Sequence, residues 1–106
     1  MASATYWMTF DIKYETTQKG TYQSRYDALM AALLKLNDGW WAQPTSFVLF
    51  GSASPRADIV QAIKGALDLS TDVAVLGAPA FKVWECIGAV ADLDVVQSMV
   101  EFAKKV

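Results

Sequence analysis

The chain has no histidine and only one cysteine, and these absences exclude several kinds of chemistry. Without an imidazole there is no Ser-His-Asp triad, no histidine general base and no zinc site of histidine and cysteine ligands. The lone Cys86 cannot form an intrachain disulfide, and the N-terminus lacks a signal-peptide pattern, so we expect a reducing, cytoplasmic location. Any bound metal would be a hard cation held by oxygen atoms, such as Mg²⁺.

Positive charge is also scarce. Nine Lys and Arg residues stand against eleven Asp and Glu residues, and only Arg25 and Arg56 are arginines. Because phosphate contacts dominate sequence-independent binding to nucleic acids, such binders usually carry a clear positive excess. A nucleic-acid partner would therefore have to meet a local patch. No apolar run approaches the roughly 20 residues that a membrane helix needs, so we expect no membrane partner.

The residues that are present predict one α+β domain over residues 1–106. Hydrophobic residues make up 54% of the chain and charged residues 19%, a balance typical of a folded domain of this size. We expect a core unit over residues 5–78, followed by a C-terminal strand and helix over 81–106.

The hydrophobic pattern places five strands and three helices along the chain. Strict alternation over 6–14 predicts a strand with Tyr6, Phe10 and Tyr14 on one face and Asp11 on the other. The other elements are a helix over 21–37, strands over 40–43 and 46–50, a helix beginning at Ser54 (the N-cap) and Pro55, strands over 73–78 and 81–88, and a last helix capped by Asp92 or Asp94 with an apolar stripe reaching Ala103. Lys104 and Lys105 suit the negative end of that helix.

The resulting order, βαββαβ with an extra strand and helix, is that of a ferredoxin-like antiparallel sheet with both helices on one face. The strands carry aromatic residues on both sides, as at Trp7, Trp40, Trp41 and Trp84. A bare aromatic face is a large exposed patch, which monomers rarely tolerate. We therefore expect a homodimer that buries this face. The alternative is that residues 81–106 fold back over it.

The short motifs along this order resemble a known family. The strand ending in "FDI" at residues 10–12 and the segment "AQPTSFVLFGSASPRADIVQAIKGAL" at 42–67 are similar to the small CRISPR-associated protein of the spacer-acquisition machinery. The "DGWW" at 38–41 is closer to its SinR-like bacterial offshoot. The resemblance covers roughly residues 4–90 and extends distantly to VapD-type ribonucleases.

This resemblance implies a ferredoxin-like homodimer in which Asp11 approaches its two-fold mate. In the family such a pair is proposed to bind Mg²⁺ and to cleave phosphodiester bonds in RNA or DNA. Many members are instead non-catalytic scaffolds between other protein subunits. The "KYETTQ" that follows at 13–18 carries one lysine where the family usually has several basic residues.

Two functions remain open: an Mg²⁺-dependent endonuclease with Asp11 as catalytic metal ligand, and a non-catalytic dimeric adaptor or protein-interaction module. Asp11 is otherwise a solvated strand residue, and Glu15 is a second possible ligand. The remaining residues each have a functional and a structural interpretation. Lys13, Lys19 and Arg25 are either phosphate contacts or solubilising charges, and Ser46 is either the family's strand serine or a hydroxyl bonded to the backbone. Trp40 and Trp41 either stack on bases or pack in the core or the dimer, and Cys86 is either a reactive thiol or a buried small hydrophobe. The "GSASP" at 51–55 is read as a helix cap, because the lysine of a phosphate-binding loop is missing.

Overall fold

The computed structural model describes residues 3–106 and shows, within them, three helices and one six-stranded mixed sheet. Residues 1 and 2, which the predicted domain includes, lie outside this part. The strands are β1 (Ala4–Asp11), β2 (Gly39–Trp41), β3 (Phe47–Ser52), β4 (Val73–Ala78), β5 (Val83–Gly88) and β6 (Lys104–Lys105). The helices are α1 (Tyr22–Leu34), α2 (Arg56–Ala66) and α3 (Leu93–Met99). The α+β class predicted from the sequence is confirmed.

The strands lie in the order β2-β3-β1-β4-β5-β6. Neighbouring strands are antiparallel except β5 and β6, which run parallel, so the sheet is mixed rather than purely antiparallel. The order of elements agrees with the prediction as far as α3, and β6 was not predicted. Lys104 and Lys105, expected beside a helix end, form this short edge strand instead.

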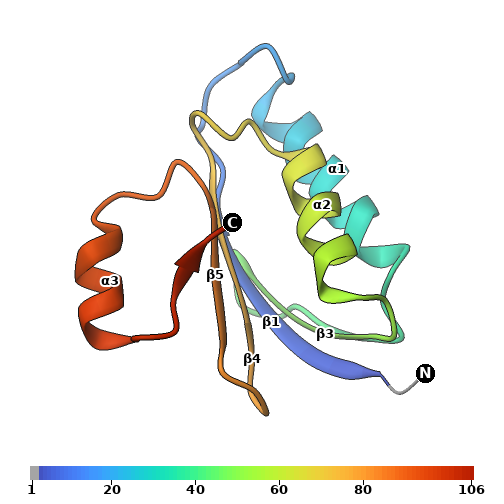
Figure 1. Ribbon diagram of the computed structural model, residues 1–106. Coiled ribbons are helices and arrows are strands. Elements are labelled where there is room, and N and C mark those ends of the chain that lie inside the picture. The colour runs from blue at the N-terminus through green and yellow to red at the C-terminus, as the bar shows by residue number, and fades with distance from the viewer. Residues whose placement is uncertain (1–2) are drawn as a thin grey trace.

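Alternation along the strands decides which side chains face the helices. α1 and α2 lie side by side on one face of the sheet, and α3 lies on the other side near the β5 edge (Figure 1). Tyr6, Met8 and Phe10 of β1 point toward α1 and α2 and are buried. Other fully buried members of this core are Leu29, Leu33, Val48, Phe50, Ile59, Ile63, Leu76 and Ile87.

Several predicted boundaries are wrong for local reasons. β1 ends at Asp11, and Tyr14, placed on the buried face by alternation, is 86% exposed because the chain turns away into a loop. Pro55 rather than Ser54 occupies the cap position of α2, and no side chain caps that helix. α3 ends at Met99, because Val100 adopts an extended backbone that ends the helical pattern before Ala103.

Candidate functional site

Asp11 is the last residue of β1 and faces away from α1 and α2, on the same side of the strand as Trp7 and Thr9. Its side chain is exposed, and the ion pairs found within residues 3–106 do not include it. The same residues contain no group of three or more acidic or cysteine side chains placed to hold a metal ion. One chain therefore offers a single carboxylate here, and Glu15 lies beyond the strand in the following loop.

Arg25, predicted from its charge as a possible phosphate contact, is buried instead. It lies on the same stripe of α1 as Leu29 and Leu33, and its side chain has no exposed surface. Its guanidinium forms five hydrogen bonds, two of them to Asp72, with an Nε–Oδ2 distance of 2.9 Å. The other acceptors are the backbone carbonyls of Lys13, Glu15 and Gly20. All five N–H groups of the guanidinium are thus used internally.

Asp72 is the buried partner that completes this arrangement. Its carboxylate also accepts hydrogen bonds from the backbone N–H groups of Lys13 and Asp68, each at 2.9 Å, and from the Thr71 hydroxyl at 3.1 Å. Burial alone raises the pKa of Asp72, but the donors together outweigh burial and hold this pKa below its ordinary value. Arg25 and Asp72 therefore fix the loop after β1 against the end of α2.

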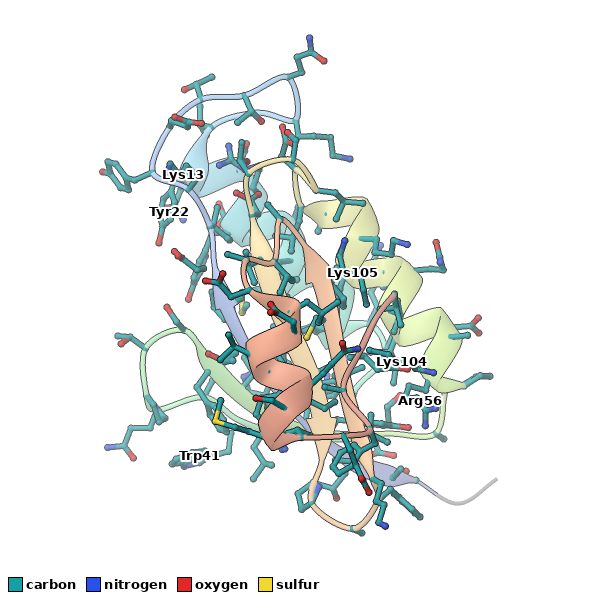
Figure 2. The ribbon with its side chains drawn as sticks, turned by 60° about the vertical axis from the view of Figure 1, so that its left-hand side comes forward. Lys13, Tyr22, Trp41, Arg56, Lys104 and Lys105 are labelled. Carbon is teal, nitrogen blue, oxygen red and sulfur yellow. The ribbon has the colours of Figure 1, made fainter. Side chains whose placement is uncertain are left out.

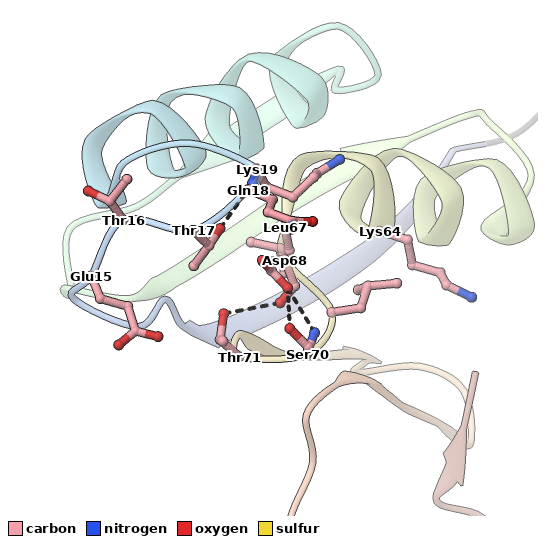
Figure 3. A pocket seen from close by; sticks show the side chains of 11 residues that line it. Glu15, Thr16, Thr17, Gln18, Lys19, Lys64, Leu67, Asp68, Ser70 and Thr71 are labelled. Carbon is pink, nitrogen blue, oxygen red and sulfur yellow. Dashed lines mark hydrogen bonds between the residues drawn. The ribbon is translucent and has the colours of Figure 1, made fainter.

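A broad cavity of about 880 Å³ lies between that loop and residues 67–71 (Figure 3). Its polar groups largely satisfy one another: Asp68 accepts from the backbone N–H and the hydroxyl of Ser70, and Lys19 Nζ donates to the Gly65 carbonyl at 2.8 Å. Hydrogen bonding, chiefly from the Ser70 hydroxyl, lowers the pKa of Asp68. The Lys19 ammonium thus satisfies a backbone carbonyl in the last turn of α2, which is a structural role.

The cations labelled in Figure 2 are spread over different parts of the molecule. Lys13 lies at one end of the molecule, whereas Arg56 and Lys104 lie together at a distant edge (Figure 2).

Ser46 lies in the turn before β3 with a positive φ of 57°, and its carbonyl, rather than its hydroxyl, accepts hydrogen bonds from Thr9 and Phe10. The predicted strand interpretation of Ser46 is therefore wrong.

The second face of the sheet, turned away from α1 and α2, is rich in aromatic and aliphatic side chains. We call it the open face. By strand register its larger members are Trp7, Trp41, Phe47, Leu49, Val73, Val75, Trp84 and Cys86, with Asp11 at one end. Trp40 instead points to the helix side and packs against the core.

The open face contains two edge-to-face aromatic pairs. The Trp7 and Trp84 rings meet edge to face at 5.2 Å between centroids, and Trp41 and Phe47 do so at 6.3 Å. Gly77 lies between the first pair in the register, and a Cβ there would overlap the Trp7 indole. The absence of a side chain at Gly77 lets the Trp7 indole lie close to the sheet. Cys86 is buried on β5 two residues from Trp84, and desolvation raises the pKa of its thiol, which fits the prediction of a small buried hydrophobe.

In comparisons with known proteins, no family model, curated protein or solved structure matches this chain. Across residues 3–106, none of the helices has the length and apolar character required to cross a bilayer. What the structure defines is a class: an α+β domain with one sheet face covered by two helices and the other left apolar and partly exposed.

Proposed function

We propose that this protein is a ferredoxin-like homodimer of the SinR-like kind that works as a protein-interaction module, with the open face as its dimer interface. The order β2-β3-β1-β4, with antiparallel neighbours and both α1 and α2 on one face, supports the ferredoxin-like assignment. The strands β5 and β6 extend that sheet at the β4 edge.

The observation that carries the proposal is that the C-terminal segment does not seal the open face. β5 and β6 continue the sheet in its own plane instead of folding over it. α3 lies on the open side, yet none of its residues is buried, and Met99 is 75% exposed. Large apolar groups on both the sheet and α3 thus remain available to a second chain.

Trp41 indicates the energy available from self-association. It is 48% exposed, and because an aromatic side chain offers about 200 Å² for burial, about 100 Å² of its surface remains accessible. Burying this area contributes about 2.5 kcal/mol per chain, hence about 5 kcal/mol for a symmetric pair. Micromolar association requires about 8 kcal/mol net of the entropy cost of bringing two chains together, so Trp41 contributes to it together with the other apolar side chains of the open face.

The test compares two exposed apolar residues on opposite faces. Light scattering after size-exclusion chromatography should give twice the chain mass for the wild type at micromolar concentration and the single-chain mass for Trp41→Lys. Leu34→Lys, at a residue of α1 that is 52% exposed, is the matched control and should remain dimeric. Loss of the dimer in the control alone would place the interface on the helices and contradict the proposal.

A second candidate function, a Mg²⁺-dependent endonuclease acting on RNA or DNA, is favoured by the position of Asp11. The residue is exposed on the same face as the proposed interface and takes part in none of the ion pairs found in residues 3–106. Two carboxylates brought together by a two-fold axis repel each other unless a cation or a proton lies between them. A Mg²⁺ ion held by the pair would activate water for phosphodiester cleavage.

Asp11→Asn tests this candidate and separates it from the first. Wild type would cleave single-stranded RNA or DNA only with Mg²⁺, Asp11→Asn would be inactive, and Asp27→Asn, an exposed control on α1, would retain activity. If wild type and both variants are equally inactive, the nuclease is excluded. If all three remain dimeric in that case, the interaction module stands.

A further inference from the structure

A second, smaller cavity lies on the helix side of the sheet, opposite the open face, between α2 and the C-terminal strand. Its volume is about 340 Å³, within the range of sites for small molecules. Its walls include Arg56, Val60 and Lys64 from α2, and Lys104 and Val106 from the end of the chain, with Glu85 of β5 below. Figure 2 shows Arg56 and Lys104 beside each other at this edge.

The charges around this cavity differ from those of the chain as a whole. Glu85 is 4% exposed and lies between Arg56, with an Nε–Oε1 distance of 3.3 Å, and Lys104, with an Nζ–Oε2 distance of 3.4 Å. Lys64 adds a third cation. Among the lining side chains, three cations and one carboxylate sum to +2, in a chain whose side chains sum to −2, and the α-carboxylate of Val106 offsets one of these positive charges. The excess of cations therefore suits the cavity to an anionic group.

One atom of this group lacks a hydrogen bond. Glu85 Oε1 is buried and, within residues 3–106, receives no aligned donor, because the nearby Arg56 Nε is close enough for an ion pair but poorly directed. A buried polar atom without a partner is costly, and a bound water, ion or ligand group is one of the ways in which proteins satisfy it. The Arg56 side chain that lies against Oε1 is 42% exposed and is free to adjust around a ligand.

The dimensions of the cavity limit what that ligand is. Arg56 and Lys64 are eight residues apart on one helix, about 12 Å along its axis, with Val60 and Val106 between them. A ligand that fits has an anionic group at one end, a body of several atoms and a hydroxyl to donate to Glu85. A phosphate monoester carries a charge of about −2 at pH 7 and is the kind of anion that arginine and lysine side chains bind.

We propose that this cavity binds a phosphorylated sugar, either free or as part of a mononucleotide. Arg56 and Lys104 contact the phosphate, Glu85 accepts a hydrogen bond from a sugar hydroxyl, and Lys64 lies at the far end. The site requires neither dimerisation nor Asp11, so it is independent of the function proposed above.

Calorimetric and NMR titration with ribose 5-phosphate tests the site, with inorganic phosphate, ribose and adenosine 5′-monophosphate as comparison ligands. We expect ribose 5-phosphate to bind about tenfold more tightly than inorganic phosphate, ribose to show no binding, and amide shifts to centre on residues 56–64 and 104–106. Tighter binding of the nucleotide would identify a mononucleotide site, and weaker binding a sugar-phosphate site. Absence of binding by both esters at about 10 mM would overturn the proposal.

Two variants separate a built site from general charge attraction. Lys104→Gln, at an exposed lysine, should weaken ribose 5-phosphate binding about tenfold, whereas Lys35→Gln, an exposed lysine at the end of α1, should leave it unchanged. Glu85→Gln should strengthen inorganic phosphate binding and reduce the preference for the sugar phosphate. Equal effects of the two lysine variants, or an unchanged preference in Glu85→Gln, would show nonspecific ion binding and contradict the assignment.

Discussion

Replacing Arg25 by methionine is the perturbation whose cost the structure defines most fully. The change removes five hydrogen bonds and leaves the Asp72 carboxylate buried without its cation. Breaking a buried ion pair by removing one partner costs about 3–5 kcal/mol. A domain of this size has about 5–15 kcal/mol of stability in total, so we expect Arg25→Met to lose about 4 kcal/mol and to approach the limit of folding.

Urea unfolding followed by circular dichroism measures this loss. Arg56→Met is the control of the same residue type, because its side chain is 42% exposed and its partner Glu85 keeps the ion pair with Lys104; we therefore expect it to cost less than Arg25→Met. Adding Asp72→Leu to Arg25→Met should recover part of the loss, since removing both charges eliminates the uncompensated carboxylate. A cost for Arg25→Met no larger than that of the control would refute the role assigned to this pair.

Three further predictions concern Asp72, Gly77 and Cys86. The folded-state pKa of Asp72 lies below the ordinary 3.8, so its contribution to stability is present at neutral pH and is lost as the pH falls below about 4. Asp72→Asn should therefore reduce the fall of the unfolding free energy below about pH 4. An unchanged fall in the variant would contradict this. Gly77→Ala should lower the free energy of unfolding by about 1–3 kcal/mol, because the added methyl group displaces the Trp7 indole. Gly65→Ala, at an open position in α2, should raise it by about 0.5–1 kcal/mol. Equal effects of the two variants in urea unfolding would be inconsistent with the packing at Gly77. Burial and the raised pKa of Cys86 predict that thiol-reactive dyes label it only on unfolding, and rapid labelling of the native protein would contradict this.

Much of the fold follows from local sequence patterns. Alternation in β1 and the apolar stripe of α2 identify those elements, because each buries one face against the same core. The turn signals "NDG" at 37–39 and Pro55 lie near the observed ends of their elements. β6 could not be predicted, since two exposed lysines carry no strand pattern and pair with β5 only because the chain returns to that edge.

The sites follow less directly from the sequence. Spacing placed Asp11 on the second face of β1, as observed, but nothing local indicates what lies opposite that face. The i, i+4, i+8 relation of Arg25 to Leu29 and Leu33 was a signal for its burial, whereas its partner Asp72 is 47 residues away and has no local signal. Glu85 likewise resembles an ordinary strand residue until α2 and the C-terminal strand bring Arg56 and Lys104 against it.

The most direct test of the central claim, self-association through the open face, is an isotope-filtered NMR experiment on a dimer mixed from labelled and unlabelled chains. Filtered cross-peaks between chains should involve the indoles of Trp7, Trp41 and Trp84, and none should involve Leu34 on α1. Interchain cross-peaks confined to α1 and α2, or their absence from a sample at high concentration, would contradict the account.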